Sequence, residues 1–316
     1  MPSSRSLVRS ITDPKPLQRY SRDFRRNKYV YLMLLPVVAF FVTFHYLPMY
    51  GAVISFKDFR PGLGIWGSPW VGFQHFQTFF RSFYFFRLVR NTILLNIYDI
   101  VWGFPAPIIF ALLLNEIRKA PFKRTVQTLS YLPYFLSMVV VCGLIVDFTS
   151  RTGFINDIVA FVGFERRNWL AMDGMFRTIY VSSNIWQNLG WGSIIYLAAI
   201  STIDPQLYES AVIEGAGRWK QTRYITLPCL VPTITILLVL RIGALMTVGF
   251  EKILLLYSPL VYETADVIAT FVYRKGILEN DYSYSAAIGL FNSIIGFSLL
   301  VTANYFSRRF SETSLW

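Results

Sequence analysis

The sequence predicts an all-α membrane protein with six transmembrane helices. Three observations predict this fold class: the composition, long stretches without charged residues, and the lack of the apolar–polar alternation of barrel strands. Hydrophobic residues make up 54% of the chain and charged residues 15%, and the mean hydropathy is +0.45. Soluble domains carry roughly 25% charged residues. A soluble globular protein and a disordered chain are therefore both poor interpretations.

Each expected span is long enough to cross a hydrocarbon core, which takes about 20 residues. In lipid, only a helix or a closed barrel satisfies its own backbone hydrogen bonds. Asp99 lies inside the second stretch and Arg241 inside the fifth, and the other four contain no charged residue. The expected spans are residues 29–56, 91–115, 126–146, 178–203, 225–250 and 282–307.

The basic residues predict the orientation. The net charge is +12, and eight Lys and Arg residues lie within residues 1–28. Such a segment fits a cytoplasmic tail on anionic lipid better than a nucleic-acid surface. We expect a basic cytoplasmic tail at 1–28, one membrane domain at 29–307 and a short cytoplasmic C-terminus at 308–316, with no nucleic-acid partner. The first span is too long for a cleaved signal peptide.

Metal and disulfide chemistry are not expected. The two cysteines, Cys142 and Cys229, lie in apolar stretches and have no metal-type spacing. The two histidines, His45 and His75, are far apart and have no HExxH pattern around them. We expect no metal site.

The segment 204–228, between the fourth and fifth spans, predicts a helix–turn–helix. Asp204 can cap a helix that has Pro205 at its first position. Gly215 and Gly217 can stop or bend that helix because glycine tolerates left-handed conformations. A second short helix can start at Arg218, before the fifth span opens at Pro228. Composition alone favours an ordinary basic loop on the membrane surface.

The spacing within this segment resembles the EAA motif of ABC importer permeases, with Ser210 in place of the usual central alanine. Further segments resemble the oligosaccharide permeases of the maltose-importer superfamily, the branch that includes the alginate importer permease. The EAA-like positions are Glu209, Ser210, Ala211, Gly215, Gly217, Ile225, Leu227 and Pro228. The further segments are 44–51, 91–92, 104–105, 111–116, 131–133 and 196–198.

The resemblance implies the type I ABC importer permease fold and a working assembly. Two permeases, usually non-identical, would form the pore, two cytoplasmic ATPases would dock on the EAA loops, and an extracytoplasmic solute-binding protein would deliver an oligosaccharide. By this analogy, Glu209 and Gly215 would sit in a groove of the ATPase. The chain has no G-x-x-x-x-G-K-[ST] phosphate loop, so we expect it to hold no cofactor, with ATP and Mg²⁺ bound by the partner ATPase. We expect this chain to lie in the bacterial inner membrane.

Polar groups within spans are candidates for the substrate path, because they are costly in lipid unless paired or wetted. Sugars stack on aromatic rings and bond to amides and charges. The alternative is that these groups only join neighbouring helices. The candidates are Asn96, Asp99, Trp102, Asn184, Trp186, Gln187, Asn188, Trp191, Arg241 and Asn292.

Arg241 has two interpretations. It can pair with Asp99 as a structural bridge, or it can face the pore and bind the carboxylate of an acidic sugar of the alginate or uronate type. The sequence favours the first interpretation only slightly.

Two other function classes fit the sequence less well. An ion-coupled secondary transporter usually shows repeats and broken helices around a midplane site, and no second half is visible in this sequence. A membrane enzyme needs a convergent acid, base, metal or nucleophile, and Asp99 has no such neighbour in sequence. The resemblance therefore predicts a transport subunit and not an enzyme.

Overall fold

The computed structural model describes residues 26–246 and 249–310, and within these ranges the regular structure is helical apart from one isolated bridge between Lys57 and Trp70. The chain forms two compact units, residues 1–53 and 54–316. Most of the expected basic tail and of the expected C-terminal segment lies outside the described residues.

The first expected span, 29–56, corresponds to an apolar helical stretch over Lys28–Phe56 that is long enough to cross a membrane. It begins in the first unit and ends just inside the second. Its parts are α2 (Lys28–Phe41), the π-helical η1 (Val42–Tyr46), α3 (Leu47–Met49) and the 3₁₀-helical η2 (Tyr50–Phe56).

Three prolines are accommodated in the same way. Pro48, Pro105 and Pro228 each follow a π-helical segment: η1, η3 (Asp99–Gly103) and η6 (Thr222–Thr226). In each case the residue before the proline donates its N–H to the carbonyl five residues back. Proline has no N–H of its own to donate. The wider turn therefore lets the helix continue past the proline without a break.

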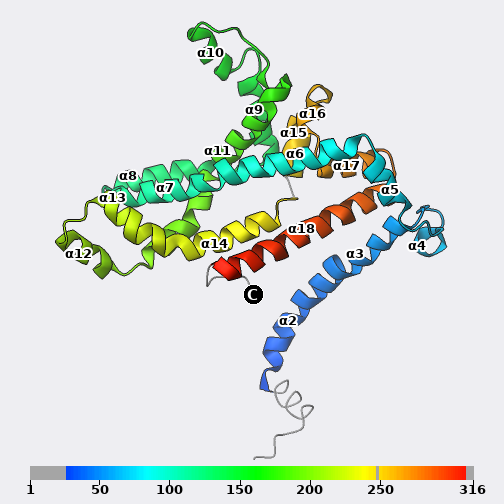
Figure 1. Ribbon diagram of the computed structural model, residues 1–316, viewed down its shortest axis with the longest axis horizontal. Coiled ribbons are helices and arrows are strands. Elements are labelled where there is room, and N and C mark those ends of the chain that lie inside the picture. Colours follow the sequence, from blue (N-terminus) through cyan, green and yellow to red (C-terminus); the bar gives the residue numbers. More distant parts are fainter. Residues whose placement is uncertain (1–25, 247–248, 311–316) are drawn as a thin grey trace, which may run out of the picture. The chain divides into compact units, whose positions relative to one another are not determined.

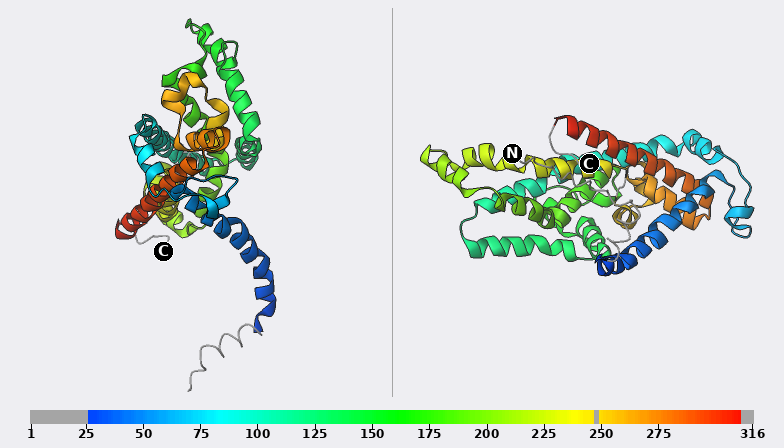
Figure 2. Two further views of the ribbon diagram at one scale, coloured as in Figure 1. Left: turned by 90° about the vertical axis from the view of Figure 1, so that its right-hand side faces the viewer. Right: turned by 90° about the horizontal axis from the view of Figure 1, so that it is seen from below.

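Five stretches are long and apolar enough to span a membrane, among the residues described. In the second unit, α14 and α18 pack against each other, and α7 packs on α11 (Figures 1 and 2). The expected fourth span, 178–203, falls in α11, which has the length of a span but is less apolar than the other five. The long helices are α6 (Tyr84–Tyr98), α7 (Pro105–Glu116), α11 (Asp173–Ser201), α14 (Leu227–Gly243) and α18 (Tyr282–Phe310).

The third expected span, 126–146, is wrong as one continuous helix. The chain forms α8 (Ala120–Tyr131), the 3₁₀-helical η4 (Leu132–Phe135) and, after a break, α9 (Met138–Thr149). Pro133 removes a backbone donor at the break, and the Ser137 side chain accepts from Val140 N as the N-cap of α9. The candidate span is accordingly Met138–Phe161. Absence of charge alone did not reveal this interruption.

The fifth span also differs from the expectation. It starts at Arg218, passes through α13 (Arg218–Gln221) and η6, and ends at Gly243 rather than at residue 250. Pro228 therefore lies inside a continuous helix instead of opening it.

Shorter elements lie towards the ends of the long helices. Figures 1 and 2 show α12 (Pro205–Ile213) at one end of the second unit, with α5 and α17 at the opposite end. The remaining elements are α4 (Gly64–Gly67), α5 (Gln74–Arg81), α10 (Phe154–Phe161), η5 (Trp169–Ala171), α15 (Phe250–Leu256), η7 (Pro259–Val261), α16 (Tyr262–Ala265), α17 (Ile268–Tyr273) and η8 (Arg274–Leu278).

The helix α11 takes part in two of the three buried clusters. One cluster joins it to α9 and α15 around Phe176 and Ile253. Another joins it to α7 and α14 around Tyr196 and Leu230. At Gly190 a Cβ atom would overlap the backbone of Ser130, so glycine is what lets α8 approach α11 closely. This central helix carries five of the ten residues expected in the substrate path.

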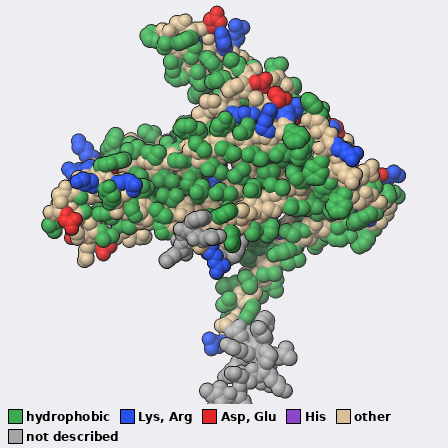
Figure 3. Space-filling view, viewed as in Figure 1, with side chains coloured by type: hydrophobic (Ala, Val, Ile, Leu, Met, Phe, Trp, Pro, Cys, Tyr) green, Lys and Arg blue, Asp and Glu red, His purple; other side chains and the backbone are tan. Residues whose placement is uncertain are grey.

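The surface of the second unit separates into an apolar flank and charged ends. Figure 3 shows hydrophobic side chains covering the long helices, with Lys, Arg, Asp and Glu gathered near their ends. Exposed residues on this flank include Ile109, Leu113, Ile294 and Phe297. An apolar band between charged ends is the surface that a membrane-spanning bundle presents to lipid.

Candidate functional site: a polar cavity and a helical loop

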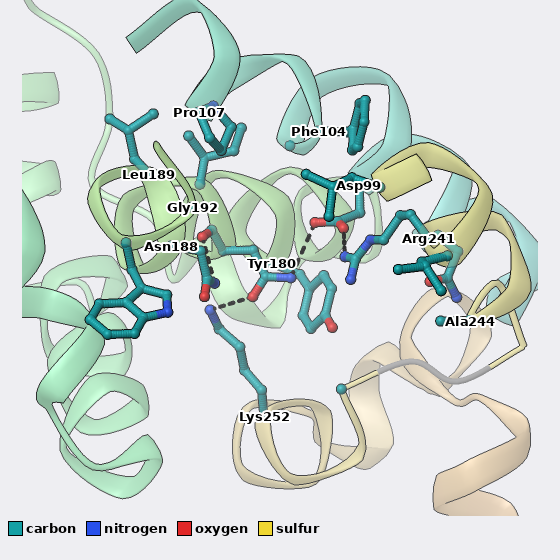
Figure 4. A pocket seen from close by; sticks show the side chains of 18 of the residues that line it. Asp99, Phe104, Pro107, Tyr180, Asn188, Leu189, Gly192, Arg241, Ala244 and Lys252 are labelled. Carbon is teal, nitrogen blue, oxygen red and sulfur yellow. Dashed lines mark hydrogen bonds and ion pairs between the residues drawn. The ribbon is translucent and has the colours of Figure 1, made fainter. Parts of the chain in front are cut away.

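A cavity of about 560 Å³ lies among α6, η3, α7, α11, α14 and α15 (Figure 4). Apolar side chains form much of its wall, and a few amide and charged groups are set into it. This composition is typical of a site for a small molecule.

Asp99 enters the cavity wall from the start of the π-helical η3. The backbone carbonyl of Asp99 accepts from Phe104 N at 2.9 Å. This hydrogen bond spans five residues, as is typical of a π-helix. Gly103 leaves room for the carboxylate, because a Cβ there would lie 2.8 Å from Asp99 Oδ1. Single π-helical turns often occur at functional positions, and this one gives the aspartate its space.

The Asp99 carboxylate is buried and has two partners. Arg241 from α14 forms an ion pair with its Oδ2, and Asn184 Nδ2 from α11 donates to its Oδ1 at 3.3 Å. Figure 4 shows the Arg241 side chain directed at Asp99. Both charged residues also line the cavity. Arg241 is therefore paired with Asp99, as the structural interpretation expects, and it also borders the cavity.

Lys252, from the short helix α15, was not among the residues expected from the sequence. Its side chain is 1% exposed, and its Nζ donates to Asn184 Oδ1 at 2.9 Å. It also reaches Gln187 Oε1 at 3.5 Å and lies 5.7 Å from the ring centre of Tyr180. Burial lowers the pKa of Lys252 to about 8 from its ordinary value of 10.5. The α15 helix has seven residues and lies between the spans α14 and α18.

Six of the ten residues expected in the substrate path line the cavity. Asn96, Asn184, Asn188 and Trp191 line it together with Asp99 and Arg241. Gln187 is not a lining residue but contacts Lys252. The face of Trp191 stacks on Tyr134 with 4.6 Å between ring centres.

The three other expected residues do not line the cavity. The side chain of Trp102 is 64% exposed and that of Trp186 is 45% exposed. Asn292 donates to the Met246 carbonyl at 3.0 Å. A role of these three in a substrate path stays a prediction.

Sequence reasoning missed Lys252, Tyr180, Tyr196 and Phe104, which also line the cavity. Lys252 stands beside the short apolar run 253–256. A charge next to an apolar run too short to span was the one available signal.

The segment 204–228 forms the expected helix–turn–helix. Asp204 Oδ1 accepts from Gln206 N at 2.9 Å and caps α12. The helix ends in a Schellman motif: Ala216 N donates to Ala211 O, and Gly215 N donates to Val212 O. Gly215 has the φ of +77° that this motif requires. Gly217 has a φ of −66°, so the expected left-handed conformation is wrong there, and Gly217 instead precedes α13 in extended backbone.

Two contacts attach this loop to the spans. Tyr208 Oη and Thr226 Oγ1 share a hydrogen bond of 2.9 Å, and Arg218 pairs with Glu116 at the end of α7 at 3.2 Å. On the outer side of the loop, Ile213 is 88% exposed and Trp219 is 79% exposed. These contacts therefore hold α12 to η6 and α13 to the end of α7, while large apolar side chains of the loop stay uncovered.

Known proteins are similar to this chain over most of its length. The model of the family "binding-protein-dependent transport system inner membrane component" matches residues 103–312. Protein LplB of Bacillus subtilis (strain 168) is 45% identical over 293 residues, which are 92% of either chain. The polygalacturonan/rhamnogalacturonan transport system permease protein YteP of the same strain is 44% identical and covers 92% of this chain and 91% of its own.

A solved structure is similar as well. A chain of a bacterial ABC transporter involved in the import of the acidic polysaccharide alginate superposes with a TM-score of 0.87 and 45% sequence identity, over 93% of this chain and 99% of that chain. These relatives share both sequence and fold with this chain along nearly its full length. The chain therefore belongs to the family of binding-protein-dependent transport system inner membrane components: it is a multi-pass inner membrane permease of the ABC importer type, a transport subunit and not an enzyme.

Proposed function

We propose that this chain forms half of the path by which an acidic oligosaccharide crosses the membrane, and that its loop 204–228 couples this path to a separate ATPase. The observation that carries the substrate half is the cavity, which places two cations and one carboxylate beside amide groups on α11. Amides suit sugar hydroxyls, and an excess of positive charge suits a carboxylate. The names of two similar proteins, which refer to polygalacturonan/rhamnogalacturonan and to alginate, support this class.

The coupling half rests on the shape and surface of the loop. A short helix with a rigid Schellman end can act as a lever, and its uncovered apolar side chains suit a groove in a partner. Glu209 is exposed on α12 and is free to meet a basic residue of that partner. Closure of the ATPases would move the loop, and the contact of Arg218 with Glu116 would pass that motion to α7.

The proposed assembly contains a second permease, which we expect to be a different chain, two ATPase subunits and an extracytoplasmic solute-binding protein. One similar solved structure is a bacterial alginate ABC transporter in complex with an alginate pentasaccharide-bound periplasmic protein, which supports the last of these partners. ATP and Mg²⁺ would be bound by the ATPase subunits. Both termini of this chain would be cytoplasmic, on the side of loop 204–228.

The experiment is co-purification of the tagged chain with the products of its neighbouring genes, comparing wild type with Gly215→Asp. Gly174→Asp is the matched control, because a Cβ at Gly174 meets no atom within 4 Å and its φ is not left-handed. We expect wild type and the control to retain the ATPase and Gly215→Asp to lose it or to uncouple hydrolysis from sugar. A wild-type chain that carries no ATPase and moves solute alone in liposomes would contradict the proposal.

A further inference from the structure

Lys252 is a buried cation that has no carboxylate partner among the described residues. Among the described Lys and Arg residues, only Lys252 is almost completely buried. Its hydrogen-bond acceptors are the neutral amide oxygens of Asn184 and Gln187. Removing an ammonium group from water without an opposite charge is costly, so the position calls for an explanation.

The other cation of the cavity differs in this respect. Arg241 is paired with Asp99, and the two charges cancel. The positive charge that remains at the cavity wall is therefore that of Lys252. Asn184 connects the two sites, since its amide nitrogen donates to Asp99 and its oxygen accepts from Lys252.

The ammonium group of Lys252 has one more donor than it has hydrogen-bond acceptors among the described residues. An ammonium group has three N–H donors. One meets Asn184 Oδ1, and a second meets Gln187 Oε1 over a longer distance. The side chain rises from α15 to the cavity, opposite α11 (Figure 4). Because Lys252 is among the residues that line the cavity, its ammonium group borders the space that a ligand would occupy.

We propose that the ammonium group of Lys252 is the site that binds a carboxylate of the sugar in the cavity. This inference rests on the proposed function and assigns its anion recognition to Lys252 rather than to Arg241. Bound there, a carboxylate supplies the opposite charge that the protein lacks, while the sugar hydroxyls face the amides of α11. A neutral sugar leaves the cation uncompensated.

The competing explanation is structural: Lys252 only ties α15 to α11 through the two amides. The two explanations differ in what the loss of charge does. A structural lysine affects every substrate equally, whereas a carboxylate site affects acidic sugars alone.

The test uses the full importer reconstituted in proteoliposomes, with trigalacturonate and its methyl ester as probes. The ester keeps the sugar rings and hydroxyls and removes the charges. To bypass selection by the binding protein, binding of both probes to the solubilised permease pair is measured as well. The variants are Lys252→Gln, which removes the charge, and Lys252→Arg, which keeps it. Lys275→Gln is the matched control, because Lys275 pairs with Glu279 outside the cavity.

The wild-type pair is expected to prefer the acid over the ester by about tenfold or more, the effect of one charge-assisted hydrogen bond. Lys252→Gln loses this preference, while Lys252→Arg and Lys275→Gln keep it. Equal losses for acid and ester in Lys252→Gln overturn the inference in favour of a structural role. A wild-type pair that binds acid and ester equally also overturns it, and this measurement needs no variant to fold.

The failure of the inference and the failure of the proposed function can be distinguished. ATP-driven uptake of the ester without preference for the acid removes the carboxylate site but leaves an oligosaccharide importer. Absence of ATP-driven uptake of any sugar, with no ATPase bound, removes both.

Discussion

Asp99 and Arg241 form an ion pair across the cavity wall and join the candidate span Tyr84–Glu116 to the candidate span Arg218–Gly243. Asp99 is the first residue of the π-helical turn that precedes Pro105, and Arg241 stands near the end of α14. The pair therefore connects the cavity to the helix that continues directly from loop 204–228. The loop and Arg241 belong to one continuous stretch of helix, so a motion of the loop can reach the site where we expect the sugar to bind.

Removal of one member of this pair should be more harmful than removal of both. Breaking a buried ion pair costs about 3–5 kcal/mol, and because the Arg241 side chain is 45% exposed we expect Asp99→Asn to cost no more than the lower end of that range. Asp99→Asn with Arg241→Gln should recover part of the loss. The measurement is the thermal denaturation midpoint of the purified complex. Additive losses in the double variant would argue against a pair.

Gly103→Ala should disturb Asp99 without altering any polar group. The new Cβ would lie 2.8 Å from Asp99 Oδ1, so the carboxylate must shift, which disturbs its contacts with Arg241 and Asn184. We expect uptake to fall several-fold. Gly143→Ala is the control, because its Cβ meets no atom within 4 Å and alanine favours the helix by about 1 kcal/mol. Equal behaviour of the two variants would contradict the close packing at Asp99.

The preference for an acidic sugar should fall as pH rises through 8. The pKa of Lys252 is lowered to about 8, so the ammonium form decreases from about 90% at pH 7 to about 10% at pH 9. The positive form binds the carboxylate, and its loss removes the preference. The groups facing Lys252 are Tyr180 and the α11 amides, Cys142 on α9 and, along its own helix, the exposed Glu251.

The measurement for this pH dependence is the ratio of acid to ester binding between pH 6 and 9. Lys252→Arg should make the ratio flat, because a guanidinium stays protonated throughout this range. A wild-type ratio that does not change with pH would rule out Lys252 as the titrating group.

Neutral substitutions at Gly215, which unlike Gly215→Asp add no charge to the loop, should follow the left-handed backbone rather than side-chain size. Its φ is +77°, and a left-handed conformation costs an ordinary residue roughly 1–2 kcal/mol. Asparagine tolerates this conformation better than alanine, so Gly215→Asn should keep more sugar-stimulated ATP hydrolysis than Gly215→Ala. The reverse order would show that size in the partner's groove decides, and not the backbone of the loop.

The parts of the fold that depend on local sequence could be predicted. Long uncharged stretches located most of the spans, and Asp204, Pro205 and Gly215 located the ends of α12. The break between α8 and α9 was missed because it depends on Pro133 and Ser137, which do not change the charge count. Backbone breakers matter as much as charges when spans are delimited.

The cavity was predictable only in part, because it is made by tertiary packing. Polar residues inside apolar stretches identified Asn184 and Asp99, and these do meet. Lys252 was missed because nothing local shows that α15, too short to span, is buried against α9 and α11. The lysine becomes part of the site only when three separate segments come together.

ATP-driven sugar uptake tests the central claim most directly. The complex of this chain with its partner permease, ATPase and binding protein is reconstituted in proteoliposomes, and uptake of trigalacturonate is followed with ATP on the ATPase side. We predict uptake that requires ATP and this chain and that Gly215→Asp abolishes. Uptake of equal rate without ATP, or without this chain, would contradict the account.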